Sequence, residues 1–158
     1  MAGSITAVLH GIQTALKVPK DQWNAFGKYP YRNAESILQS VKPLLPEGAV
    51  VLCNVTAVPC DVGGVAHVMC MATATLKAGA EEISAQAYAV EPLEKKGMDA
   101  AQLSGATISY AKKYALANLF AIDGTKDSDA MEQQYQQPAQ QPYQQQPLYP
   151  GEYGGYVQ

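Results

Sequence analysis

The chain has 158 residues, with 11 Lys and Arg against 14 Asp and Glu and a formal net charge of −3 at pH 7. This length suits a single domain with an ordinary hydrophobic core. There is no apolar run long enough to cross a bilayer and no basic-then-apolar start, so we expect neither a membrane span nor a secretory signal. All 11 basic residues fall within residues 1–130, beside 12 acidic ones, so nucleic-acid binding would depend on how the charges are sorted over the surface.

The first predicted elements are a helix and an aromatic loop. Residues 4–18 carry apolar residues at helical spacing, and Pro19 is expected to end this helix. The loop that follows, KDQWNAFGKYPYR, interleaves basic with aromatic residues, a pattern that suits single-stranded nucleic acid because cations meet phosphates while rings stack on bases. We predict that Trp23 and Phe26 plug this loop into the core. The candidate DNA contacts in it are Lys28, Tyr29, Tyr31 and Arg32.

A second helix and three strands are predicted next. Asn33 can cap the helix AESILQSVKPLL, which Pro46 closes. Residues 49–57, 65–76 and 82–90 alternate apolar and polar residues at period two, which predicts an antiparallel sheet with one buried face. The links at residues 59–64 and 77–80 carry Gly and other turn residues, so both are expected to be hairpins.

The longest helical pattern closes the folded part, after a loop that contains Lys95 and Lys96. Ser104 is the predicted N-cap, and Gly124 lies where the helix is expected to stop. Ile108, Ala111, Ala115 and Leu119 fall on one stripe with Leu116 beside it, while Tyr110 and Tyr114 fall opposite with Lys113 next to them. Lys112 lies between Ile108 and Leu116, so its ammonium either extends past the apolar stripe or faces a groove that carries an anion. An ordinary amphipathic helix with solvated lysines is the alternative, and Lys95 and Lys96 are either a solvated loop tip or a clamp beside Lys112 and Lys113.

This segment resembles the motif that ends the core domain of the essential recombination function (ERF) family of phage single-strand annealing proteins. The matching residues are Gly105, Ser109, Tyr110, Ala111, Lys112, Lys113, Tyr114, Ala115 and Leu116, followed by Asp123, Asp127 and Asp129. Residues 19–45 also resemble the family, so the likeness covers roughly residues 5–130. Both basic positions are lysine where relatives often carry arginine, which keeps the charge but loses the bidentate fork.

The order of predicted elements gives an α+β domain with a three-stranded antiparallel sheet. The resemblance implies that its β-β-β-α core is the one shared with the eukaryotic ring-forming annealing mediators. It further implies ATP-independent binding of single-stranded DNA and annealing of complementary strands in phage recombination, by a non-enzymatic protein in the bacterial cytoplasm. The implied partners are single-stranded DNA, further copies of the chain in a ring or filament, and a phage exonuclease or host single-strand binding protein. A protective single-strand binder without annealing activity remains an alternative.

No motif for catalysis or cofactor binding is visible in the sequence. There is no GxxxxGK[ST], HExxH, Cys/His cluster or Ser/His/Asp arrangement, and the three cysteines lack a CxxC pair, so we expect no metal and no cofactor. Asp123, Asp127 and Asp129 fail the EF-hand pattern, because the twelfth position is Gln134. We interpret them as a polar exit from the helix. A metal-dependent nuclease built on them is the less favoured alternative.

The composition changes at about residue 130. Residues 131–158 contain ten Gln, five Tyr, four Pro and three Gly, with almost no aliphatic residues to bury. Such a segment cannot offset the entropy lost on ordering, so we predict a folded domain at residues 1–130 and a disordered tail at residues 131–158. The spaced tyrosines suit weak self-association or docking of a partner protein.

Overall fold

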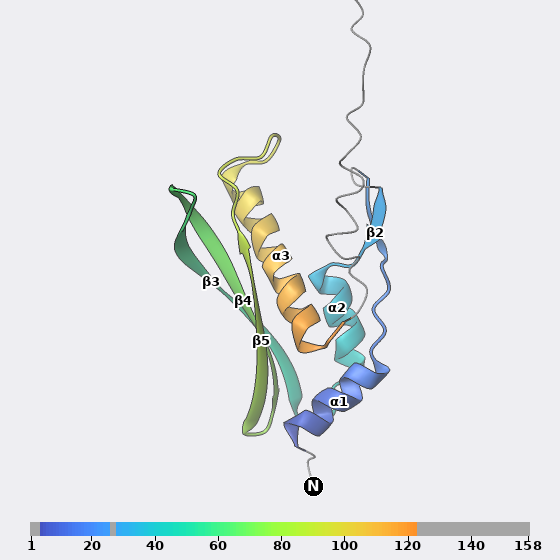
Figure 1. The fold of residues 1–158 in the computed structure, drawn as a ribbon. Coiled ribbons are helices and arrows are strands. Elements are labelled where there is room, and N and C mark those ends of the chain that lie inside the picture. Colours follow the sequence, from blue (N-terminus) through green and yellow to red (C-terminus); the bar gives the residue numbers. More distant parts are fainter. Residues whose placement is uncertain (1–3, 26–27, 123–158) are drawn as a thin grey trace, which may run out of the picture. The chain divides into compact units, whose positions relative to one another are not determined.

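The computed structural model describes residues 4–25 and 28–122 (Figure 1). The predicted tail, Phe26, and the acidic residues Asp123, Asp127 and Asp129 therefore lie outside the described residues. The elements follow one another as α1 (Ile5–Ala15), β1 (Gln22–Asn24), β2 (Tyr29–Tyr31), α2 (Ala34–Val41), a 3₁₀ helix η1 (Lys42–Leu44), β3 (Ala49–Val62), β4 (Val65–Ala78), β5 (Glu81–Val90) and α3 (Ala100–Leu119).

The main sheet has the antiparallel order β3-β4-β5, with Val55 opposite Ala72 and Ala72 opposite Ala87. Helix α3 lies against one face of this sheet, α2 lies on the other side of α3, and α1 lies near the end of the sheet, where the Ile5 N–H donates to the Glu81 carboxylate (Figure 1). This arrangement confirms the predicted α+β class and the β-β-β-α order of the core.

The predicted single buried face of the sheet is confirmed beneath α3 but not toward the hairpin tip, where Val68 is 41% exposed. Cys70, Ala72, Ala74 and Leu76 of β4 are buried beneath α3, and Val51, Cys53 and Val55 of β3 pack against the same core. The predicted stripe of α3 is also confirmed, because Ala111, Ala115, Leu116 and Leu119 are buried and Ile108 packs at the edge. The facing alanines of α3 and β4 let helix and sheet approach closely, which orients the opposite side of α3 away from the sheet.

The predicted helix boundaries are wrong in three places. Helix α3 begins at Ala100 and not after Ser104, because Asp99 and Gln102 form a capping box in which the Asp99 carboxylate accepts the Gln102 N–H at 2.8 Å. The same helix ends at Leu119, before Gly124, because the next residue, Phe120, is buried and Ala121 takes a positive φ of 50°. Helix α1 ends at Ala15, four residues before Pro19.

The aromatic loop also differs from its prediction. It forms a short antiparallel hairpin, in which Gln22 pairs with Tyr31 and Asn24 with Tyr29. The prediction that Trp23 plugs into the core is wrong, because its side chain is 62% exposed. Trp23 pairs with Pro30 on the face of the ribbon opposite to Tyr29 and Tyr31, because successive strand residues point to opposite faces.

The β3–β4 hairpin is longer than predicted. The turn falls at Gly63 and Gly64, whose φ values of 64° and 84° favour glycine, and β3 continues through Pro59 to reach it. An edge strand tolerates this proline because one side of its backbone needs no partner. The last pairs of the hairpin extend past the end of β5, so this tip is covered by neither β5 nor α3.

Candidate nucleic-acid interface

The side of α3 that faces away from the sheet carries a compact cluster of one cation and two rings. The Lys113 ammonium lies 4.2 Å from the centroid of the Tyr110 ring and 4.5 Å from that of Tyr114. The two rings meet edge to face with centroids 4.9 Å apart, and their hydroxyl groups are hydrogen-bonded at 3.1 Å. Spacings of three and four residues on one helix bring these side chains together. The sequence predicted this grouping.

Burial shapes the protonation of the cluster. Burial lowers the pKa of the Lys113 ammonium from its ordinary value. Burial also raises the pKa of Tyr114 to about 12, with further contributions from its hydrogen bond to Tyr110 and from nearby Tyr29. The cluster is therefore a half-buried ammonium held against two phenol rings. An ammonium over ring faces keeps its N–H donors available for an anion such as phosphate.

Lys112 does not join this cluster. Successive helical residues differ by about 100° in direction, so Lys112 lies on the flank of α3 that faces β3. Cys53 is a half-buried residue on the inner face of β3. Burial raises the pKa of its thiol, and the positive charge of Lys112 offsets part of this increase. The structure thus separates the two lysines that the sequence places side by side. Phosphate contacts by each remain a prediction.

The β1–β2 hairpin brings Tyr29 close to the cluster. Tyr29 is one of the groups that raise the pKa of Tyr114, so the two phenols lie within electrostatic range of each other. Its own hydroxyl accepts a hydrogen bond from the Asn24 amide at 3.0 Å, and its ring meets Tyr31 edge to face at 6.4 Å. Tyr31 and Arg32 are half-buried, whereas Lys28 is exposed with a positive φ of 52°. Tyr29 thus lies within electrostatic range of α3.

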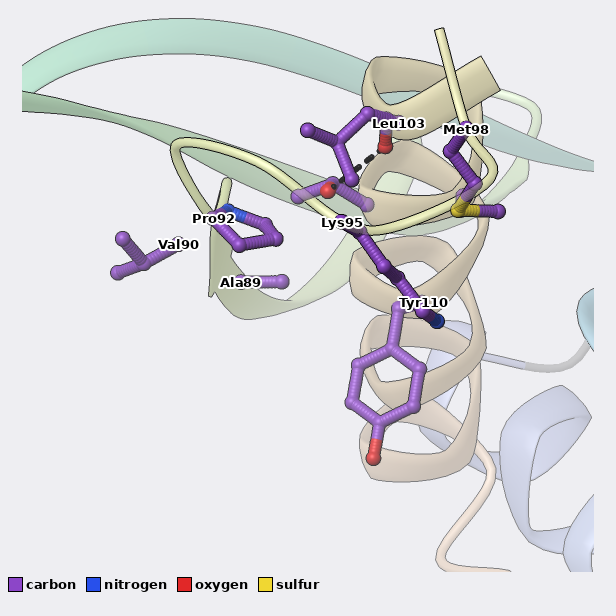
Figure 2. A pocket seen from close by; sticks show the side chains of 9 residues that line it. Ala89, Val90, Pro92, Lys95, Met98, Leu103 and Tyr110 are labelled. Atoms are coloured by element: carbon purple, nitrogen blue, oxygen red, sulfur yellow. Dashed lines mark hydrogen bonds between the residues drawn. The ribbon is translucent and has the colours of Figure 1, made fainter. Parts of the chain in front are cut away.

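The loop between β5 and α3 brings Lys95, but not Lys96, to Tyr110. The Met98 N–H donates to the Lys95 carbonyl at 3.1 Å, which closes a four-residue turn in which Gly97 has a φ of 84°. The Lys95 side chain runs along α3 toward Tyr110 (Figure 2). Lys96 is exposed and does not line the hollow beside Tyr110 that Lys95 borders. The sequence indicated the lysine pair but not that only Lys95 would face Tyr110. Gly97, which directly follows the two lysines, is the residue that could have predicted the turn.

Two anchors fix the ends of this loop. At its start, the Glu91 N–H donates to the Val68 carbonyl at 2.7 Å, and both carboxylate oxygens of Glu91 accept from the Ser104 hydroxyl at 2.9 Å. The His67 ring nitrogen Nδ1 also lies 3.1 Å from the Glu91 carbonyl oxygen. At its end stands Asp99, the N-cap of α3. Lys95 is thus held on a short segment between two fixed points.

Metal sites and reactive thiols find little support in the described part of the chain. Among residues 4–25 and 28–122 no group of three His, Cys, Asp or Glu residues could hold a metal ion. Burial raises the pKa of the thiols of Cys53 and Cys70, which makes reactive thiolates unfavourable there. No helix in these residues is long and apolar enough to cross a membrane.

Comparisons with known proteins identify similar sequences. The model of the ERF superfamily matches residues 5–151. The essential recombination function protein of Salmonella phage P22 is 46% identical over 139 residues, which cover 88% of this chain and 65% of that relative. The chain thus spans slightly less than two thirds of the length of the relative it matches. No solved structure matches.

Proposed function

The chain belongs to the ERF superfamily, and from this premise we propose that it binds single-stranded DNA and anneals complementary strands without ATP in phage recombination. The observation that carries the proposal is the Tyr110–Lys113–Tyr114 cluster. Cations that follow a phosphate backbone, beside rings on which bases stack, are the elements of single-strand binding without sequence preference. Tyr29 and Lys95 extend the same surface on either side of Tyr110 and Tyr114.

The near-neutral charge of the folded part is compatible with this function. One half-buried ammonium over two rings, with Lys95 close by, supplies positive charge along one side of α3. Local sorting of charge, and not net charge, sets the attraction of a phosphate backbone to such a surface. Lys28, Tyr31, Arg32, Lys96 and Lys112 complete the set of proposed DNA contacts.

Annealing itself is tested with two complementary oligonucleotides. The purified chain, without ATP or metal, is expected to accelerate formation of the duplex from strands that carry a fluorescent donor and an acceptor. A protein that binds each strand but slows pairing would be the protective binder. Cleavage of either strand on addition of Mg²⁺ would favour the nuclease.

We include self-association in the proposal, because one small domain covers too few nucleotides to align two strands. The outer face of the sheet supports it. No described element covers this face, and Tyr88 is exposed there at 67%, with Val90 and Leu52 also exposed. Beside it, β3 is an edge strand of 14 residues with an unpaired side. A long edge strand with exposed apolar residues is a ready surface for another chain, and we assign it to a second copy in a ring or filament.

Changing Tyr88 to Lys is expected to reduce assembly size, because a charge on the outer face opposes burial against a second copy. Light scattering after size exclusion measures the molar mass. Leu93→Lys is the matched control, since Leu93 is equally exposed but lies in the loop after β5. If Tyr88→Lys keeps the native circular dichroism spectrum and the molar mass is unchanged, the outer face of the sheet is not the interface between copies.

A chain that ends at Asp129 is expected to keep a similar free energy of unfolding and to anneal naked oligonucleotides. Residues 131–158 contain no Lys or Arg to neutralise phosphates and few aliphatic residues to add to a core. What this chain is expected to lose is higher-order assembly or a contact with an exonuclease or single-strand binding protein. The family match extends to residue 151, so the boundary at 130 is itself under test. Loss of annealing on truncation would place part of the DNA-binding surface beyond it.

A further inference from the structure

A shallow cavity, open to solvent, lies between the loop after β5 and the first half of α3. Its volume is about 180 Å³, and much of its lining, including Met98 and Tyr110, is itself exposed. The lining is mainly apolar and includes Pro92, Met98, Leu103 and Ala106 (Figure 2). Three polar residues, Lys95, Thr107 and Tyr110, also line it. A shallow, mainly apolar space of this volume suits the face of one flat ring system.

The cavity is continuous with the cation–ring cluster. Leu103, Ala106, Thr107 and Tyr110 follow one another at spacings of three and one, and Lys113 continues the same strip of α3. From Ala106 to Lys113 the helix rises about 10 Å, at about 1.5 Å per residue. Tyr110 borders the cavity and also contacts Lys113. A DNA strand bound at Lys113 would therefore pass the mouth of the cavity within one or two nucleotides.

The lining fits the chemistry of a nucleobase. A base has two apolar faces and a polar edge, and it is joined to an anionic backbone. Apolar side chains and the 53% exposed Tyr110 ring can contact the faces. Lys95, beside the opening, can meet the phosphate or an acceptor on the base edge. The Thr107 hydroxyl already donates to the Leu103 carbonyl at 3.0 Å, so the interior presents no unpaired donor from this residue to an apolar ring.

We propose that this cavity binds one nucleobase of the single strand whose phosphate Lys113 contacts. The inference rests on the proposed DNA binding and adds to it a base-holding position in each chain. Because Glu91 and Asp99 fix the ends of the loop, the position exists before DNA arrives. One base per chain would be held, while its neighbours remain available for pairing. The lining contains no group selective for one base, so the site is expected to be tolerant of sequence.

The first test compares thymine oligonucleotides with oligonucleotides of equal length that carry abasic sugars, using the unaltered full chain. Both ligands offer the same phosphates. The base-containing strand is expected to bind at least about fivefold more tightly at one salt concentration, with an equal salt slope for the two. Equal affinities would overturn the base site but leave DNA binding intact. If neither strand binds, the proposed function itself fails.

The second test assigns the preference to this cavity. Ala106→Leu fills the space without changing charge and is expected to reduce the preference for thymine over abasic strands, by lowering affinity for the thymine strands alone. Ala101→Leu is the matched control, because Ala101 is exposed on the same helix but does not line the cavity. An undiminished preference in a folded Ala106→Leu would overturn the inference, since it would assign all base contacts elsewhere, for example to Tyr29. A changed molar mass with unchanged base preference would assign the cavity to a second copy and also overturn it.

Discussion

Replacing Lys95 and Lys113 together with alanine is expected to lower the salt slope of single-strand binding by about 1.4, the sum of about 0.7 for each lost phosphate contact. If binding at 1 M salt is unchanged, the affinity at 0.1 M falls about 25-fold. The reason is geometric, because both side chains reach Tyr110, from the loop and from α3 respectively. Titrations of a fluorescent oligonucleotide at several salt concentrations measure the slope.

The control is a second double variant, Lys17 and Lys42 to alanine, which removes the same charge from exposed positions outside the candidate surface. It is expected to change the slope little. Lys112→Ala is measured separately, because Lys112 lies on the flank of α3 that faces β3. An unchanged slope in the folded Lys95/Lys113 variant would assign both lysines to a solvated face.

The same surface has an expected pH dependence. A lysine binds phosphate only while it is protonated, and burial lowers the pKa of Lys113. Its contribution is therefore complete below this lowered pKa and is lost as the pH rises through it, earlier than for an exposed lysine. Tyr114, with a pKa of about 12, remains neutral over the same interval. The same oligonucleotide titration, repeated at several pH values, measures this dependence of DNA affinity on pH. The dependence should disappear in the variant with Lys95 and Lys113 changed to alanine.

The sequence predicted those parts of the fold that depend on periodicity. Alternation placed Ala72 and Ala74 on the buried face of β4, and helical spacing placed Ala111 and Leu116 against them. Both patterns exist because one side of each element is dry, so they appear in the sequence itself. The grouping of Tyr110, Lys113 and Tyr114 was predictable for the same reason.

The sequence could not predict features that depend on contacts between distant segments. Ser104 looks like an N-cap locally, but Asp99 and Gln102 form the capping box, and the Ser104 hydroxyl is then used by Glu91. Trp23 is a large apolar residue that the pattern assigns to the core, yet it lies exposed on the β1–β2 ribbon. The cavity beside Tyr110 depends on how residues 92–98 return over α3, and no local pattern encodes that path.

The other large effect expected is on stability. Leu116→Ala is expected to lower the free energy of unfolding by about 2–5 kcal/mol, because removing a buried leucine loses its transfer free energy and leaves a cavity. Leu116 is 0% exposed and belongs to the same buried cluster as Ile37 of α2 and Leu76 of β4. A domain of this size typically has a free energy of unfolding of about 5–15 kcal/mol. The variant should therefore be much less stable, and partly unfolded if the unaltered chain lies near the lower end of this range.

Urea unfolding followed by circular dichroism measures the change, with all variants at one chain concentration because self-association would add to the apparent stability. Leu93→Ala makes the same chemical change at a 67% exposed position and is expected to stay within about 0.5 kcal/mol of the unaltered chain. Leu116 is fully buried, whereas Tyr110 of the cation–ring cluster is 53% exposed, so the folded fraction of Leu116→Ala should keep its salt slope for DNA. A loss below about 1 kcal/mol would contradict the packing of α3 described above. A loss of slope without a loss of stability would mean that the buried and DNA-facing sides of this helix are not separate.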